Sequence, residues 1–220
     1  VSNPVDVPDR IRVPIMSLPA CRSSTSLGSG TALDTARLQS ELARRFHISP
    51  KNVHAHVFGE HGDSSFVPWS LADIANVPID DYKELCPEPE NIKWDRNYDE
   101  MEEFVRTSGA KVIKSKGATF YAVAISVCHI CKCIFSGAGT ALTVSAMMHG
   151  EYGIDDVCLS TLSLVGPDGL ASKVIAPLTE EETALLHKSA EQPQVRHRGN
   201  QALITDKNAF PAACGRRECL

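Results

Sequence analysis

The stretch "VHAHVFGEHGDSSF", residues 53–66, decides the fold class, because an apolar strand runs directly into a polar loop. The run "NVHAHVFG", residues 52–59, predicts a strand of five or six residues. The loop after it places Glu60, His61 and Asp63 between two glycines and a serine pair. A histidine there suits proton transfer near neutral pH, but an ordinary turn has the same composition. His61 therefore needs a partner elsewhere in the chain.

The stretch "GSGTALDTAR", residues 28–37, offers that partner at the start of a predicted helix. Thr31 and Asp34 resemble a capping box, with an aspartate where Glu or Gln is usual. Apolar residues then recur at helical spacing, with the charged residues on the other face: Leu38, Leu42 and Phe46, against Glu41, Arg44 and Arg45.

One turn of this helix carries both a carboxylate and a guanidinium. A buried carboxylate can hold an imidazole in one tautomer and stabilise its charged form, which is a role for Asp34 beside His61. Arg37 lies three residues after Asp34, on roughly the same face, and can bind a substrate carboxylate bidentately. Each of the three residues also has an ordinary structural interpretation, as a helix charge, a surface residue or a turn residue.

The rest of the chain predicts long helices and a hairpin. We expect an exposed helix over 95–117, a buried helix over 118–135, two strands around "GPDG" within 155–178, and a helix capped by Thr179 and Glu182. The apolar run 118–135 is short for a membrane span and contains His129 and Lys132, so we interpret it as a core helix.

Composition limits the function classes. The net charge of −5 argues against nucleic acid or an acidic membrane as a partner. The start "VSNPVDVPDR" has no secretion signal, so we expect a cytoplasmic protein with reduced cysteines. The cluster "CHICKC", residues 128–133, lacks the second ligand pair of a structural zinc site, so we predict no metal.

Several ordered motifs together resemble the L-lactate dehydrogenase family of the lactate/malate dehydrogenase superfamily. They are "VSNPVDV", "GSGTALDTAR", "GEHGDSSF", "KSKGATFYAVA" and "LTVSAMMHGEYGI". The resemblance implies an α+β fold with an antiparallel sheet and long helices, and with most of the Rossmann domain missing. It implies three parts: a remnant of the dinucleotide-binding domain and an irregular junction over 1–27, a catalytic substrate-binding domain over 28–190, and an irregular tail over 191–220.

The resemblance also implies roles for single residues. His61 would be the proton donor and acceptor, oriented by Asp34, while Arg37 would bind the substrate carboxylate. Asn3 would form hydrogen bonds near the reacting oxygen and the nicotinamide. Thr119 would line the substrate pocket, and Val123 would pack on the nicotinamide ring. His54 matches one position of an allosteric fructose 1,6-bisphosphate site, but Gln39 stands where that site has an arginine.

The implied reaction is NAD-dependent interconversion of L-lactate and pyruvate, in a tetramer when the enzyme is intact. No "GxGxxG" follows a strand near the start, and the mobile loop that sets much of the substrate choice is absent. We therefore expect the chain to be weak or inactive alone. Two alternatives stay open: a dehydrogenase for malate or a branched 2-hydroxy acid, and a non-catalytic interface fragment. Residues 9–27 and 191–220 are either divergent or the product of a shifted reading frame.

Overall fold

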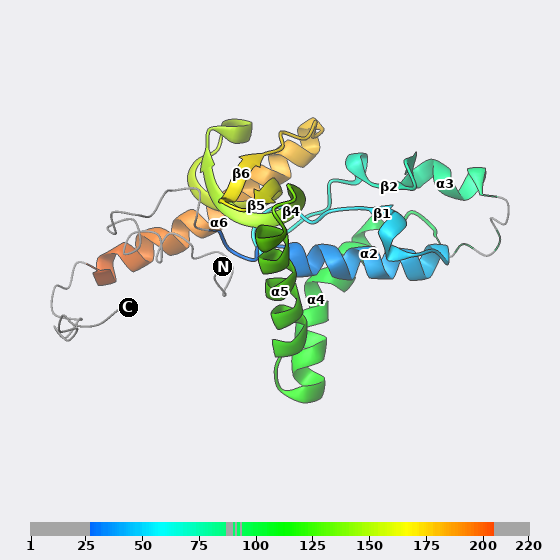
Figure 1. The fold of residues 1–220 in the computed structure, drawn as a ribbon, viewed down its shortest axis with the longest axis horizontal. Helices are drawn as coiled ribbons and strands as arrows, with labels where there is room; N and C mark the ends of the chain where they lie inside the picture. Colours follow the sequence, from blue (N-terminus) through cyan, green and yellow to red (C-terminus); the bar gives the residue numbers. More distant parts are fainter. Residues whose placement is uncertain (1–26, 87–89, 91, 93, 205–220) are drawn as a thin grey trace.

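The computed structural model describes residues 27–86, 90, 92 and 94–204 and contains two three-stranded antiparallel sheets with long helices (Figure 1). The larger sheet holds β4 (Thr140–His149), β5 (Asp155–Gly166) and β6 (Gly169–Lys173). The smaller sheet holds β1 (Val53–His54), β2 (Asp73–Ile74) and β3 (Val77–Pro78). The helices are α2 (Ala32–Phe46), α3 (Ile79–Leu85), α4 (Tyr98–Lys116), α5 (Phe120–Ser136) and α6 (Glu180–Ile204), with short 3-10 helices η2 (Pro50–Asn52), η3 (Trp69–Leu71) and η5 (Glu151–Gly153). The expected α+β fold with an antiparallel sheet is confirmed.

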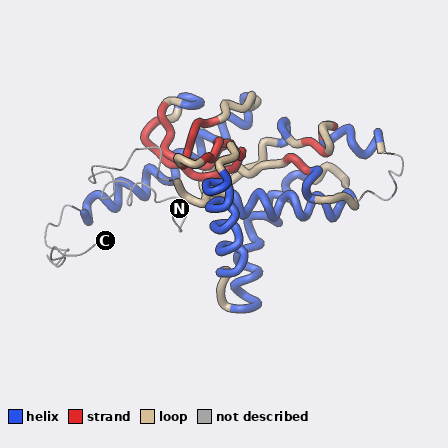
Figure 2. Tube along the Cα trace, in the orientation of Figure 1, coloured by secondary structure: helices blue, strands red, loops and turns tan. Residues whose placement is uncertain are grey.

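The larger sheet, the curved red part of the tube in Figure 2, contains the predicted hairpin as β5 and β6. β5 ends at Gly166 and β6 begins at Gly169, so Pro167 and Asp168 make the turn. β4 pairs with β5 from Thr140 onward and shifts register between Met147 and His149.

Helix α2 packs by the predicted apolar stripe. Leu38 and Leu42 are fully inaccessible and join the core that β1, α3 and α4 complete. The polar face was predicted less well, because Glu41 is buried: it accepts hydrogen bonds from Arg44 and Arg45, which satisfy its charge. The capping box at Thr31 and Asp34 is wrong, since neither side chain caps the helix and both bond other elements.

Helix α5 corrects another expectation. Its apolar sequence predicted a buried helix, yet among its residues only Ile130 and Cys133 are buried. One face packs on β5 and α2, and the rest of the helix runs away from the sheet toward its connection with α4 (Figure 1). Large apolar side chains are therefore exposed along it: Phe120, Tyr121, Ile125 and Phe135.

Helix α6 begins with the predicted capping box. The Thr179 amide donates to Glu182 Oε2 and the Glu182 amide donates to Thr179 Oγ1. Leu186 and Ala190 then pack under the larger sheet against Phe58 and Leu159. The helix continues to Ile204, past the boundary expected at 190. Residues 1–26, which include Asn3, and 205–220 lie outside the described residues.

Candidate functional site

The structure brings three predicted residues together at the start of α2. Asp34 Oδ2 lies 2.5 Å from His61 Nδ1, and Asp34 Oδ1 lies 3.0 Å from Arg37 Nη1. The Asp34 side chain is 7% exposed, whereas the imidazole of His61 is 41% exposed. A buried carboxylate thus connects an accessible imidazole to a guanidinium that bonds no other described residue.

The contact with Asp34 assigns the tautomer of His61. A carboxylate only accepts hydrogen bonds, so Nδ1 must carry a proton. The proton that His61 gains or loses is then the one on Nε2. Asp34 also offsets the positive charge that the imidazole acquires when Nε2 is protonated.

Close backbone contact places the first turn of α2 against the larger sheet. Gly30 has φ +54°, and a Cβ on it would lie 2.5 Å from the Ser145 amide nitrogen and 2.6 Å from Ser160 Oγ. The same Ser160 hydroxyl accepts a hydrogen bond from the Thr31 amide, at 3.1 Å. The helix that carries Asp34 is therefore held at its N-cap residue, Thr31.

Two threonines of α2 and its preceding turn hold the segment that leads to His61. Thr31 Oγ1 donates to the carbonyl oxygen of Val57, and the Val57 amide donates to Thr35 Oγ1 at 3.0 Å. The strand predicted over 52–59 is shorter than expected, because β1 contains only Val53 and His54. Beyond His54, the peptide of Val57 bonds these two hydroxyls instead of a neighbouring strand.

The loop of His61 is anchored to β5 and α6. Gly59 and Ser160 exchange backbone hydrogen bonds of 2.9 and 3.0 Å. The Glu60 amide donates to Ser189 Oγ at 2.7 Å, and Ser64 Oγ donates to Glu60 Oε2 at 2.8 Å. Ser160 therefore touches both motifs, the turn before Asp34 and the loop before His61.

The other predicted site residues do not join this group. Thr119 is the N-cap residue of α5 and makes no side-chain cap bond; Val123 is half-buried in the next turn. Figure 1 places the first turn of α5 at the lower end of the molecule, away from the start of α2. The roles of Thr119 and Val123, like that of Asn3, stay predictions.

His54, the weak allosteric candidate, pairs with an acid. Its Nδ1 lies 2.9 Å from Asp73 Oδ1, and its side chain is half-exposed. The Gln39 amide nitrogen donates to the Ala55 carbonyl oxygen at 3.1 Å, so it bonds backbone next to His54. This arrangement supplies no strong cation for a phosphate.

A pocket of about 390 Å³ lies between α2, α5 and β4. It is lined partly by Thr35, Gln39, His56 and His129. Burial lowers the pKa of His56, the nearby His54 lowers it further, and Asp73 opposes them. His56 Nδ1 is buried with no hydrogen-bond partner in the described part of the chain. His56 is thus a half-buried imidazole whose neutral form is favoured.

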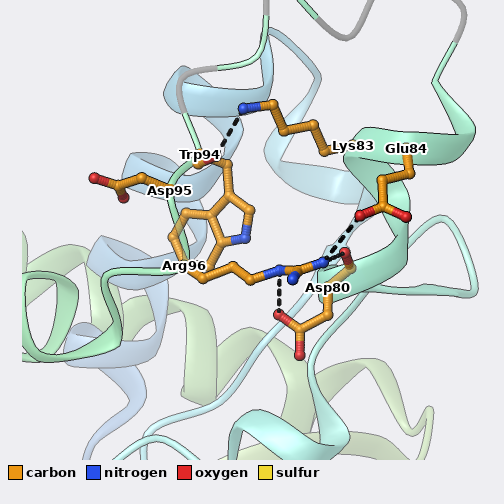
Figure 3. Close-up of a pocket in the computed structure, with 6 residues that line it drawn as sticks. All are labelled: Asp80, Lys83, Glu84, Trp94, Asp95 and Arg96. Atoms are coloured by element: carbon orange, nitrogen blue, oxygen red, sulfur yellow. Dashed lines mark hydrogen bonds and ion pairs between the residues drawn. The ribbon is translucent and has the colours of Figure 1, made fainter.

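Figure 3 shows a second pocket, of about 540 Å³, beside α3. Arg96 pairs there with Asp80 and Glu84, and Lys83 Nζ donates to the Trp94 carbonyl oxygen. Tyr98 OH also donates to Asp80; burial and that carboxylate raise the pKa of Tyr98 to about 12. Arg96 with its two acids, and Lys83 with a carbonyl oxygen, join α3 to the segment before α4, which is a structural role.

Other chemistry is limited within the described ranges. No group of three or more His, Cys, Asp or Glu residues there is placed to hold a metal ion. Four of the described cysteines form no disulfide: Cys86, Cys128, Cys131 and Cys133. No helix of that part of the chain is long and apolar enough to cross a membrane.

Sequence reasoning missed the residues that support the site. Thr31 and Thr35 flank Asp34 in "TALDT", one helical turn apart, and that spacing could have marked them as a pair facing one neighbour. Ser160 and Ser189 carry no such signal, because their partners lie 129 residues away in the sequence.

Comparison with known proteins adds an independent finding. Residues 31–195 match the model of the lactate/malate dehydrogenase alpha/beta C-terminal domain. An L-lactate dehydrogenase of Acetivibrio thermocellus is 39% identical over 190 residues, which are 86% of this chain and 58% of that protein. An L-lactate dehydrogenase of Thermoanaerobacter sp. (strain X514) is 40% identical over 191 residues, or 87% of this chain and 60% of that protein.

A solved structure agrees. A lactate dehydrogenase enzyme from a Medee basin deep-sea metagenome library superposes with a TM-score of 0.81 at 33% identity, covering 90% of this chain and 61% of that one. The chain spans about three fifths of the length of these relatives.

Proposed function

Because the chain belongs to the lactate/malate dehydrogenase family, we propose that Asp34, Arg37 and His61 are the substrate-binding and proton-transfer half of an NAD-dependent L-lactate dehydrogenase. The observation that carries the proposal is the Asp34 carboxylate, which contacts both the imidazole and the guanidinium. The proposed substrates are pyruvate and L-lactate. The proposed setting is a cytoplasmic tetramer, as the family resemblance implies.

The residues suit the two ends of a 2-oxo acid. Arg37 binds the carboxylate, and the N–H groups that it does not use on Asp34 can form a bidentate pair. His61 donates the Nε2 proton to the carbonyl oxygen as the carbonyl carbon is reduced. In the oxidation of L-lactate, neutral His61 takes the hydroxyl proton at Nε2. The Asp34 carboxylate accepts the Nδ1 hydrogen bond in both directions.

NAD supplies the hydride and accepts it in the reverse direction. Among the described residues, Val123 is the position that the family resemblance gives to the nicotinamide ring, and it is half-buried near the start of α5. Both described sheets are antiparallel, and no described strand leads into a glycine-rich phosphate loop. We therefore propose that this chain alone is weak or inactive.

The test is NADH oxidation at neutral pH with pyruvate and with oxaloacetate. It uses the 220-residue chain and the same chain joined to the N-terminal dinucleotide domain of an L-lactate dehydrogenase relative. We expect turnover only in the joined protein, with pyruvate preferred, and its loss in a His61→Asn variant. A joined protein that binds NADH and still reduces neither acid would reject the proposal.

A second candidate function rests on the exposed apolar face of α5. Phe120, Ile125 and Phe135 are more than half exposed, as expected of an interface fragment without catalysis. A joined protein that forms a defined oligomer without turnover would favour this alternative. Preference for oxaloacetate or a branched 2-oxo acid would instead reassign the substrate.

A further inference from the structure

We propose that Thr31 and Thr35 are positioning residues: their hydroxyls hold the peptide of Val57 and thereby keep His61 against Asp34. This inference rests on the proposed function, because it concerns the geometry of the Asp34–His61 pair. We call Thr31 and Thr35 the threonine clamp.

The clamp grips both sides of one residue. Thr31 Oγ1 donates to the Val57 carbonyl oxygen, and the Val57 amide donates to Thr35 Oγ1 at 3.0 Å. Since Thr35 Oγ1 accepts that bond, its own proton can go to Thr143 Oγ1, 2.9 Å away on β4. Val57 is 1% exposed, so no water replaces these partners.

Val57 needs the clamp because the strand ladder has already ended. β1 stops at His54, and the next backbone pairing of this segment is the bridge between Phe58 and Phe66. A buried peptide group without hydrogen-bond partners is unfavourable. The two hydroxyls therefore favour the placement of Val57 beside α2.

The clamp joins the two segments that carry Asp34 and His61. Asp34 lies between Thr31 and Thr35 in the same turn, and His61 follows Val57 by four residues. The imidazole is 41% exposed, and the position of its backbone helps to set its distance from Asp34. The clamp sets the distance between the two elements that carry the pair.

The test uses the 220-residue chain and needs no turnover. The pH titration of the His61 ring protons is followed by NMR, with His61→Gln to assign the signal and Asp34→Asn to show the full effect of losing the pair. Exchange of the Val57 amide hydrogen reads the Thr35 bond directly. The variants are Thr35→Val, Thr31→Val, the hydroxyl-retaining Thr35→Ser, and Thr143→Val as the control.

We expect Thr35→Val to speed Val57 amide exchange by about tenfold. We also expect it to move the His61 titration part of the way toward that of Asp34→Asn, and Thr35→Ser to restore the titration of the parent. Thr143→Val should leave the titration unchanged, because both bonds to Val57 remain. If Thr35→Val does not fold, Thr31→Val tests the same clamp. It removes the hydrogen bond to the Val57 carbonyl oxygen, and it should move the His61 titration in the same direction.

The outcomes separate the inference from the proposed function. Faster Val57 exchange with an unmoved His61 titration would overturn the inference, since the threonines would then be structural only. An Asp34→Asn variant that titrates like the parent would reject the pair itself, and with it the proposed function.

Discussion

Asp34 contacts two functional groups through separate oxygens, Oδ1 to Arg37 and Oδ2 to His61. An amide in its place presents one acceptor and one donor, so Asp34→Asn cannot serve both groups with the present tautomer of His61. In the joined protein we expect kcat for pyruvate reduction to fall by about 10²–10⁴-fold. Asp63→Asn, on the exposed part of the loop that carries His61, should keep kcat within a factor of about two of the parent. Equal losses in both variants would contradict this role.

Gly30 is the residue at which a single methyl group should matter most. Its φ of +54° is strained for any other residue, and a backbone nitrogen would lie 2.5 Å from an added Cβ, which leaves no room for a side chain. We expect Gly30→Ala to cost about 2–4 kcal/mol of unfolding free energy, measured by urea denaturation. Gly109→Ala is the matched control: nothing lies within 4 Å of its Cβ position in α4, so alanine should stabilise the helix by about 0.5–1 kcal/mol.

At the scale of elements, the periodic segments could be predicted from the sequence and the connections between them could not. The spacing of Leu38 and Leu42 fixes the buried face of α2, and the Thr179–Glu182 pair marks the start of α6. The pattern around Val57 suggested a strand because alternation records burial, not hydrogen-bond partners. Those partners are α2 hydroxyls, which no local pattern reveals.

The site divides in the same way. His61, Asp34 and Arg37 could be chosen because their chemistry and spacing suit proton transfer and carboxylate binding, and the motif order added the family. Thr31 was assigned to a cap because local rules favour the nearest backbone amide, yet its hydroxyl bonds Val57 across the fold. Apolar composition likewise predicted that α5 is buried, although it cannot say what covers the helix.

The start of α6 is held by a buried carboxylate. Burial tends to raise the pKa of Glu182, but hydrogen bonds from Ser70 and Thr179 outweigh it, so the pKa is lowered. A lowered folded-state pKa stabilises the fold above the ordinary glutamate pKa, and this contribution is lost as the pH falls through the lower, folded-state pKa. We expect Glu182→Gln to cost about 1.5–3 kcal/mol at pH 7, and progressively less as the pH falls below the ordinary glutamate pKa, by urea denaturation. Glu181→Gln, exposed in the same turn, should cost little at either pH.

At the scale of the molecule, one half-buried histidine should make stability depend on pH. The folded-state pKa of His56 is lowered, chiefly by burial, so the unfolded chain binds more protons below about pH 6.5. Stability should therefore fall as the pH drops below that value. His56→Gln should reduce this loss between pH 7.5 and 5, measured by urea midpoints. His47→Asn, at the exposed end of α2, should retain the loss of the parent.

The exposed face of α5 should govern association of the whole chain. Ile125 is 71% and Phe135 86% exposed, which is unfavourable for isolated copies in water. We expect concentration-dependent self-association by sedimentation velocity, and its reduction in an Ile125→Gln/Phe135→Gln double variant. Lys132→Gln, which removes a charge from the same helix and no apolar surface, should associate like the parent. A monomeric parent would contradict this prediction.

The hydroxyl of Ser189 has a consequence for biosynthesis. It accepts the Glu60 amide hydrogen and fills the space beside Gly59, although it comes 129 residues later in the chain. A ribosome that has translated α2 and the His61 loop has therefore not yet made the residue that completes the loop. The Glu60 amide therefore lacks this acceptor until α6 emerges from the exit tunnel. Release of a chain terminated before residue 189 would leave both motifs present and the loop unfinished.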